Sequence, residues 1–328
     1  IAGQVGTNFL GTDAFQEVDL VGITQPITKW SYQIRRAEDV AWAVARAFYV
    51  AKSGRPGPVV LDFAKNAQVE KTEYAPTKVD YVRSYLPVPE MEPEAIRKAA
   101  ELINGAERPL VLVGQGVELG EAQQELRAFI EKAGMPAGCT LLGLSALPTN
   151  HPLNKGMLGM HGNLGPNINT NKCDVLIAVG MRFDDRVTGV VNEFAPRAKI
   201  VHFDVDAAEI NKNVSADYRV LGDLRWSLPL LRGKLEASAE DYRAQFAKWN
   251  QYTITMSSER PFTYRRDRGC IMPQQLIEKV SELVDDDTIV VTDVGQHQMW
   301  AAQFYNAKKP RQFLTSGGLG TMGYGLPA

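Results

Sequence analysis

The sequence predicts an α/β protein built on parallel β-sheets, and three observations support this fold class. Short runs such as residues 109–113 and 175–179 are almost continuously apolar, as is typical of strands that are buried on both faces of a parallel sheet. These runs alternate with segments that carry apolar side chains at helical spacing. The length of 328 residues exceeds one ordinary domain, so two or three domains are expected.

The N-terminal part of the chain contains a predicted helix, loop and strand. Residues 38–53 carry apolar side chains along one helical face, at Val40, Val44, Ala47, Phe48 and Ala51. The glycines and prolines of residues 53–58 end this helix, and the apolar run 59–63 predicts a strand. Residues 64–93 are charged, contain four prolines and show no apolar stripe, which indicates an interdomain linker.

A complete α/β unit follows this linker. We expect a helix over residues 94–104, strands over 109–114, 175–180 and 199–204, and helical segments between the strands. A helical tail over 224–256 and a basic segment, 260–268, lead to a further helix over 272–283 and a strand over 288–292. The pattern therefore predicts one complete central domain between two incomplete ones.

The composition excludes several classes of protein. The chain is 45% hydrophobic and 23% charged, which is typical of a soluble globular protein. A net charge of −2 gives no indication of a nucleic-acid partner, and no apolar run has the length of a membrane span. Three widely spaced cysteines, Cys139, Cys173 and Cys270, argue against a disulfide framework or a zinc site and favour a reducing compartment.

Glycines and arginines follow two of the central strands and predict a ligand site. Gly114 and Gly116 follow one strand, and Gly180, Arg182 and Arg186 follow another. Ligands of open α/β sheets bind beyond the carboxyl ends of strands, where arginine suits a phosphate or a carboxylate. The dinucleotide fingerprint G-x-G-x-x-G is absent, and a solvated, salt-bridged turn is the alternative for residues 182–186.

Four further positions have both a functional and a structural interpretation. Asp204 and Asp223 follow apolar runs, where an acid accepts from a ribose hydroxyl or caps the next helix. The predicted loop 156–162 contains methionines that form either an apolar wall for a flat ligand or ordinary core. Lys65 follows a strand and contacts an anion or solvent, while the isolated His161 and His297 have no neighbours at metal-ligand spacing.

The stretch with the strongest chemical signal lies after the last predicted strand. Residues 292–300 read T-D-V-G-Q-H-Q-M-W, and residues 317–325 contain five glycines in nine positions. A glycine-rich run lets the backbone approach a ligand closely, because no Cβ atoms stand in the way. This stretch therefore predicts a cofactor pocket.

Several segments together resemble the catalytic large subunit of the acetohydroxyacid synthases (acetolactate synthases), a thiamine-diphosphate-dependent enzyme family. The most specific stretches are R-F-D-D-R-V-T-G at 182–189 and G-Q-H-Q-M-W-A-A at 295–302. Further matching stretches occur in family order at 3–5, 11–17, 53–58, 156–162 and 316–328. The resemblance extends over essentially the whole chain.

The resemblance implies a three-domain architecture, of which this chain holds an internal piece. Residues 1–75 would be the C-terminal part of a pyrimidine-binding domain, and residues 76–92 a linker. Residues 93–257 would form the whole central FAD-binding domain, followed by a linker at 258–271. Residues 272–328 would be the N-terminal part of the diphosphate-binding domain.

The resemblance also implies three sets of site residues. The residues that would line FAD are Gly114, Gly116, Thr140, Leu141, Leu158, His161, Gly180, Arg182, Asp184, Val187, Asp204, Val205 and Asp223. The residues that would contact thiamine diphosphate are Val294, Gly295, Gln296, His297, Gly320 and Met322. The substrate pocket would be shaped by Phe15, Gln16, Lys65, Met160 and Arg186.

The implied activity is carboligation. Pyruvate is decarboxylated and its two-carbon unit is transferred to pyruvate or 2-oxobutyrate, the first common step of valine, leucine and isoleucine biosynthesis. FAD would have no redox role, and Mg²⁺ would be held by residues beyond Ala328. The implied partners are 2-oxo acids, further copies of the chain with the active site at the subunit interface, and a small regulatory subunit. The expected location is the cytoplasm, with a lost organellar targeting segment as the alternative.

One departure and two rival functions accompany this resemblance. Residues 64–66 are Ala-Lys-Asn where the family usually has Pro-Lys-Asp, and Lys65 is retained. Because the glutamate and the metal ligands of the family lie outside the sequence, the piece by itself is expected to be inactive. The rivals are another enzyme with FAD and thiamine diphosphate, such as a pyruvate oxidase, and a non-catalytic nucleotide-binding module.

Overall fold

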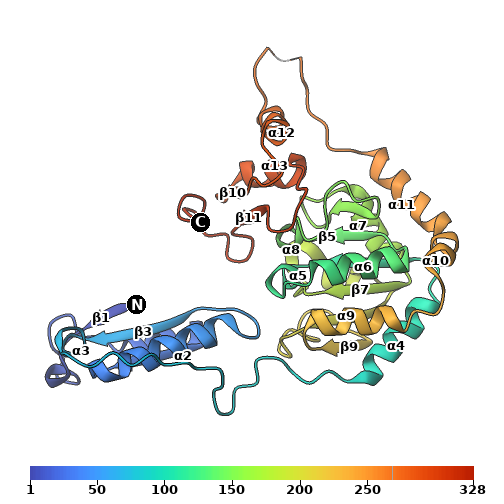
Figure 1. Ribbon diagram of the computed structural model, residues 1–328. Helices are drawn as coiled ribbons and strands as arrows, with labels where there is room; N and C mark the ends of the chain where they lie inside the picture. Colours follow the sequence, from blue (N-terminus) through green and yellow to red (C-terminus); the bar gives the residue numbers. More distant parts are fainter. Residues whose placement is uncertain (268) are drawn as a thin grey trace. The chain divides into compact units, whose positions relative to one another are not determined.

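The computed structural model describes residues 1–267 and 269–328, and the chain divides into two compact units, 1–88 and 89–328 (Figure 1). Both units are α/β structures whose paired strands are all parallel. The predicted fold class is therefore confirmed.

The first unit consists of a three-stranded sheet and a packed helix. The strands β1 (Ala2–Gln4), β2 (Trp30–Ile34) and β3 (Val59–Ala64) lie in the order β1-β3-β2. Helix α2 (Val40–Lys52) buries Ala43, Ala47 and Val50, and its alanines allow a close approach to Ile34 and Leu61 of the sheet. This helix and β3 confirm the elements predicted over residues 38–53 and 59–63.

Short helices complete this unit. They are α1 (Leu20–Thr24), α3 (Lys65–Val69) and the 3₁₀ turns at Thr7–Phe9, Gln25–Ile27 and Ala37–Asp39. The linker predicted from residue 64 was wrong for α3, which is a helix. The Asn66 side chain holds this helix in place by accepting from the Thr7 N–H and donating to the Arg35 carbonyl. The helix was not predicted because five residues are too few to show a periodic apolar stripe.

The second unit contains a six-stranded sheet in the order β6-β5-β4-β7-β8-β9. The strands are β4 (Pro109–Val113), β5 (Ala137–Cys139), β6 (Asn154–Met157), β7 (Val175–Val179), β8 (Lys199–Asp204) and β9 (Tyr218–Leu221). The chain moves outward in one direction from β4 to β6 and then returns to place β7 on the other side of β4. The strand order therefore reverses between the neighbouring strands β4 and β7.

Helices cover both faces of this sheet (Figure 1). They are α4 (Pro93–Asn104), α5 (Gly116–Leu119), α6 (Gln123–Ala133), α7 (Leu164–Lys172), α8 (Asp185–Thr188), α9 (Leu224–Gly233), α10 (Ala239–Gln245) and α11 (Ala247–Glu259). Val111 and Ile177 pack with α4, α6 and α9 in one core, whereas Leu110 and Leu176 pack with Trp249 of α11 in another. This double burial explains why the central strands are continuously apolar, and each such side chain contributes about 1.5–3 kcal/mol.

The C-terminal part packs against the central sheet domain through a shared core. It consists of α12 (Pro273–Leu283), β10 (Val290–Thr292), α13 (Gln296–Phe304) and β11 (Phe313–Thr315), with β10 paired to β11. Ala301, Tyr305 and Phe313 from this part form one buried cluster with Met157 and the partly buried Leu141. Residues 260–267 and 269–272 form no helix or strand, and Arg268 of the predicted linker lies outside the described residues.

Candidate cofactor site

The register of the six-stranded sheet brings the predicted FAD residues into one row. Five strands pair at residues immediately before this row, through Met157–Cys139, Cys139–Val113, Val113–Val179 and Val179–Phe203. The next residue in each strand or loop is therefore a member of the row: Leu158, Thr140, Gly114, Gly180 and Asp204. All five positions lie at the carboxyl edge of the sheet, where open α/β sheets bind their ligands.

The glycines at the reversal point pack against each other. A Cβ on Gly114 would lie 2.2 Å from the Gly180 carbonyl oxygen, and one on Gly180 would lie 2.6 Å from the Gly116 Cα. The Gly116 N–H donates to the Gly180 carbonyl over 2.8 Å, and the Gly114 N–H donates to Val179. These two N–H groups are therefore satisfied within the protein, and an anion bound here needs other donors.

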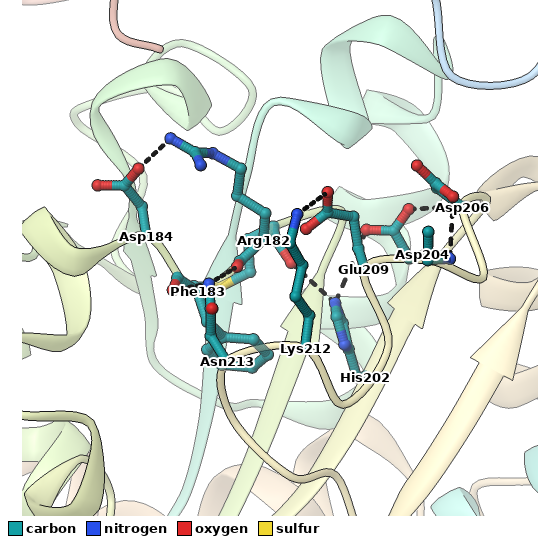
Figure 2. Close-up of polar contacts among 11 residues, drawn as sticks. Arg182, Phe183, Asp184, His202, Asp204, Asp206, Glu209, Lys212 and Asn213 are labelled. Atoms are coloured by element: carbon teal, nitrogen blue, oxygen red, sulfur yellow. Dashed lines mark hydrogen bonds and ion pairs between the residues drawn. The ribbon is translucent and has the colours of Figure 1, made fainter. Parts of the chain in front are cut away.

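Arginine and aspartate side chains project from the turn after β7 (Figure 2). Arg182 forms an ion pair with Asp184, and the Asp184 carboxylate accepts from the Arg186 N–H over 2.9 Å as the N-cap of α8. Phe183 adopts a positive φ of 51° and buries its ring against His202, with ring centroids 4.9 Å apart. The turn is thus salt-bridged, as the structural interpretation predicted, and its Arg182 side chain remains 43% exposed.

Asp204 ends β8 next to a buried histidine (Figure 2). The His202 Nε2 lies 2.8 Å from the Met181 carbonyl oxygen and 3.7 Å from the Asp204 carboxylate. Burial lowers the His202 pKa, although the Met181 carbonyl and the charge of Glu209 oppose this effect. The Asp204 carboxylate also accepts from the Asp206 N–H over 2.9 Å, which orients it at the edge of the sheet.

Asp223 is the N-cap of α9. Its carboxylate accepts from the Arg225 N–H over 2.8 Å and pairs with the Arg225 guanidinium. Partial burial raises its pKa, but the hydrogen bonds from Arg225 outweigh burial and leave the pKa below its ordinary value. In this structure Asp223 therefore acts as a helix cap, which was the structural alternative to a ribose contact.

The remaining predicted FAD residues lie in the short helices and loops that follow the row. Leu141 begins a 3₁₀ turn, Leu141–Gly143, which the Thr140 hydroxyl caps by accepting from the Gly143 N–H over 3.1 Å. Gly116 begins α5, and Val187 lies in α8. Val205 directly follows β8, and His161 is exposed in the loop after β6.

The loop after β6 brings together two of the predicted substrate residues. The Met160 N–H donates to the Arg186 carbonyl over 2.8 Å, and the Arg186 Nη1 lies 3.9 Å from the Met160 sulfur. Met157 belongs to β6, so the predicted loop begins later than expected, and Met157 and Leu158 are core residues. Met160, in contrast, is 60% exposed and available for an apolar contact.

An aspartate holds the glycine-rich end in place. The Asp293 carboxylate accepts from the Val294 N–H over 2.6 Å and from the Gly323 N–H over 2.9 Å, and these bonds lower its pKa. Gly295 has a φ of 153°, which favours glycine, and it caps α13. A Cβ on Gly320 would lie 3.8 Å from Val294, so the two predicted thiamine diphosphate segments meet.

The other predicted thiamine diphosphate residues face solvent. Gln296 and His297 lie exposed in the first turn of α13, and Met322 is 79% exposed. Below them the buried Gln298 side chain donates to the Thr315 hydroxyl over 2.7 Å, and Thr315 bonds Thr292 over 2.7 Å. Hydrogen bonds among Thr292, Thr315 and Gln298 therefore join β10, β11 and α13 beneath the exposed residues.

Three predicted substrate residues belong to the first unit. Phe15 is 89% exposed and Gln16 has a positive φ of 66°, in the loop before α1. Lys65 is exposed at the beginning of α3, directly after β3.

Sequence reasoning missed Asp293, Gln298 and Glu118. Asp293 directly follows a strand, and Asp204 ends one, so the position of Asp293 was a usable signal. Gln298 and Glu118 gave no such signal, because only the tertiary structure shows that both are buried and bonded.

The described residues contain neither a cluster of metal ligands nor a membrane-spanning helix. No three His, Cys, Asp or Glu side chains gather there in a way that could hold a metal ion. No helix among them combines the length and the apolar character that crossing a membrane requires.

Family models match two parts of the chain. Residues 96–231 match the central domain of the thiamine pyrophosphate enzymes, and residues 293–328 match their C-terminal TPP-binding domain. The first match contains the row at the sheet edge, and the second contains the glycine-rich end.

Individual relatives match over the whole chain. It is 44% identical to the acetolactate synthase large subunit of Corynebacterium glutamicum, 45% identical to that of Parasynechococcus marenigrum and 42% identical to the chloroplastic acetolactate synthase of Arabidopsis thaliana. These matches cover 100% of this chain and 52%, 53% and 49% of the respective relatives, so the chain spans about half their length. Together with the two family models, they show that this chain belongs to the thiamine pyrophosphate enzymes.

Proposed function

We propose that the protein containing this chain is an acetolactate synthase, which decarboxylates pyruvate and joins the resulting two-carbon unit to a second 2-oxo acid. The similarity to proteins of that name in bacteria and plants supports this proposal. The observation that carries it is the combination of a dinucleotide-type sheet edge with a glycine-rich thiamine diphosphate segment in one compact unit.

FAD is the proposed ligand of the sheet edge. The order β6-β5-β4-β7-β8-β9 runs outward from the first strand in the same way as in sheets that bind dinucleotides. Gly114, Gly116 and Gly180 place no side chains at the reversal point. Arg182 offers an exposed guanidinium for a phosphate, and Asp204 offers an acceptor for a ribose hydroxyl. These groups fit an anionic dinucleotide. Arg182 supplies the phosphate donor, because the Gly114 and Gly116 N–H groups already donate to backbone carbonyls.

Thiamine diphosphate is the proposed ligand of the glycine-rich end. When bound, it supplies a carbanion-stabilising ring for decarboxylation and carbon–carbon bond formation. Val294, Gly295, Gln296, His297, Gly320 and Met322 are proposed to hold it, because the two segments that carry them meet at Asp293 and Gly323. Mg²⁺ is proposed to accompany the diphosphate.

Arg186 is proposed to hold the carboxylate of the acceptor 2-oxo acid, with Met160 as the adjacent apolar wall. Arg186 is exposed, and its only ion-pair partner among the described residues is Asp185, which is also exposed and lies 3.8 Å away. Such a pair is worth little, so the guanidinium is available for a substrate. Phe15, Gln16 and Lys65 are proposed to contribute to substrate binding across a subunit interface. The proposed assembly is a cytoplasmic homo-oligomer that also binds a regulatory subunit.

The test of the function is a product assay on the holoprotein. Supplied with thiamine diphosphate, Mg²⁺, FAD and pyruvate, it should form acetolactate and CO₂. Adding 2-oxobutyrate should divert part of the product to the corresponding ethyl homologue. Formation of acetate or acetyl phosphate in place of acetolactate would instead indicate an oxidase, and no turnover of pyruvate would favour a non-catalytic module.

The role of Arg186 is tested by substitution. Arg186→Ala should reduce the rate of carboligation about 100-fold or more, because it removes a bidentate charge partner of the acceptor. Arg186→Lys should recover part of the loss, and Arg197→Ala, at another exposed arginine, should have little effect. An unchanged apparent affinity for the acceptor in Arg186→Ala would refute this role.

A further inference from the structure

Glu118 is a buried carboxylate that none of the proposed ligand contacts uses. It lies in α5, two residues after Gly116, and is only 9% exposed. Ser145 donates to its Oε1 over 3.3 Å, and Gln123 donates to its Oε2. A buried carboxylate needs such partners, so the network around Glu118 is a built feature of the fold.

Arg311, in the turn before β11, completes this network. Its backbone N–H donates to the Glu118 Oε1 over 3.2 Å, and its Nη2 donates to the Glu118 backbone carbonyl over 3.0 Å. The guanidinium Nε also lies 3.9 Å from the Glu118 Oε2, and the Nη2 lies 3.3 Å from Glu121. Two backbone groups and two charged side chains therefore link α5 to the turn before β11.

The backbone of Arg311 indicates that this linkage constrains the turn. Arg311 has a φ of 61°, a left-handed conformation that non-glycine residues adopt at a cost of about 1 kcal/mol or more. Surrounding contacts must hold such a residue in place. The Gln312 side chain adds to them by accepting from the Lys308 and Lys309 N–H groups over 2.8 Å each.

The contact between Glu118 and Arg311 joins the segments that carry the two proposed cofactor sites. Glu118 follows the Gly114–Gly116 turn at the sheet edge, and Arg311 precedes β11, whose Thr315 is bonded to Gln298 of α13. A second contact runs parallel to it, because Gly317 packs so closely on Leu142 that a Cβ would lie 2.7 Å from the leucine side chain. Ordering either turn therefore restricts the other.

We propose that Glu118 and Arg311 are positioning residues that couple the flavin site to the thiamine diphosphate site, so that each cofactor binds more tightly when the other is present. This inference rests on the proposed function, because it assumes both cofactors. A cofactor that orders its own turn reduces the ordering cost of the second cofactor, which is positive cooperativity without a large structural change. The coupling is necessarily reciprocal.

The test measures the flavin dissociation constant of the holoprotein with and without thiamine diphosphate and Mg²⁺. In the unsubstituted protein, thiamine diphosphate should tighten flavin binding about fivefold or more. In Glu118→Gln and in Arg311→Met this ratio should fall towards one, and the double variant should fall no further, since both residues act through one linkage. A merely structural role would weaken both flavin constants and leave their ratio unchanged.

Matched variants keep the test decisive. Glu121→Gln removes the exposed acid that contacts the same Arg311 and should retain the ratio. Arg311 is 55% exposed, so Arg311→Met and Arg311→Lys leave the core intact even if Glu118→Gln fails to fold, and Arg311→Lys should retain part of the ratio. Hydrogen exchange over residues 313–323 should slow on flavin addition in the unsubstituted protein and not in Arg311→Met.

Two results would overturn the inference, and they are distinguishable. If both cofactors bind and the ratio is one in the unsubstituted protein, or is unchanged in Arg311→Met, the coupling is refuted and the proposed function stands. If the unsubstituted protein binds no flavin under any condition, the proposed function fails and the coupling fails with it.

Discussion

Single residues at the sheet edge show how burial sets the charge state of the site. His202 is fully buried, its Nε2 faces the Met181 carbonyl, and its Nδ1 has no hydrogen-bond partner among the described residues. Burial lowers its pKa, so the folded protein holds a neutral imidazole that donates from Nε2. This neutral ring packs against Phe183 and supports the turn that carries Arg182.

The lowered pKa of His202 predicts a loss of stability in mild acid. The unfolded chain takes up a proton near the ordinary histidine pKa of about 6.5, whereas the folded chain resists it. Unfolding therefore binds a proton in the window between the lowered pKa and about 6.5, and the free energy of unfolding falls as the pH falls through that window. Urea titrations without cofactors, between about pH 7 and 5, should show a steeper decline for the unsubstituted chain than for His202→Gln.

A matched control is available for this prediction. His161 is exposed, so His161→Gln should leave the pH dependence of the unsubstituted chain unchanged. Equal slopes for His202→Gln and the unsubstituted chain would show that the buried ring makes no contribution.

The three free cysteines differ in predicted reactivity. Burial raises the pKa of Cys139 and of Cys173 to about 12, whereas Cys270 is exposed. Because the thiolate is the reactive form, a thiol reagent at neutral pH should label one cysteine quickly in the native chain and all three after unfolding. Rapid labelling of a second cysteine in the native state would contradict the buried positions.

At the scale of elements, the contact between the β4 and β7 turns fixes the geometry of the sheet edge. Gly180 has a φ of 61° and would place a Cβ 2.6 Å from Gly116. Gly189 also has a positive φ, 60°, but its ψ of −123° lies outside the left-handed helical region, and nothing lies within 4 Å of its Cβ position. A methyl group at Gly189 therefore meets backbone strain alone, whereas one at Gly180 also meets the neighbouring turn.

This pair gives a prediction about stability. Gly189→Ala should cost roughly 1–3 kcal/mol, because residues other than glycine rarely adopt its backbone conformation. Gly180→Ala should cost roughly 2–4 kcal/mol, because the methyl group forces the two turns apart in addition to the strain of the positive φ. The free energies of unfolding from urea titrations measure both values. A cost of only about 1 kcal/mol for Gly180→Ala, the penalty of the positive φ alone, would show that the turns can separate freely.

The elements that could be predicted are those whose sequence pattern is long and uniform. Strands β4, β7 and β8 were predicted because burial on both faces makes them continuously apolar, and α2, α4 and α12 because each has a helical stripe or a clear beginning. The three-residue β5 and the polar, glycine-containing β6 were not predicted, since partners far along the chain determine them. Short strands of this kind carry too little local signal.

The candidate site follows the same division. Gly114, Gly180 and Asp204 were recognisable because each is the last residue of a predicted strand. Their alignment in one row could not be recognised from the sequence, because it depends on the register of five strands. Glu118 and Arg311 lie 193 residues apart and meet only in the folded unit, so no local pattern could have revealed their contact.

At the scale of the whole molecule, the second unit combines a dinucleotide-type sheet with a segment that matches the TPP-binding domain of the thiamine pyrophosphate enzymes. The two are joined by a shared hydrophobic core, by the Gln303 side chain that donates to the His161 carbonyl over 2.9 Å, and by the Glu118–Arg311 contact. In the proposed reaction, FAD is expected to contribute to the architecture around the carboligation chemistry and to transfer no electrons between substrate and product.

The most direct test of this account follows the flavin during turnover. The holoprotein is mixed with pyruvate under anaerobic conditions, and the visible flavin absorbance is recorded while acetolactate is measured in the same samples. The account predicts that acetolactate accumulates over many turnovers while the flavin spectrum stays oxidised. Stoichiometric bleaching of the flavin by pyruvate, with no acetolactate formed, would contradict it.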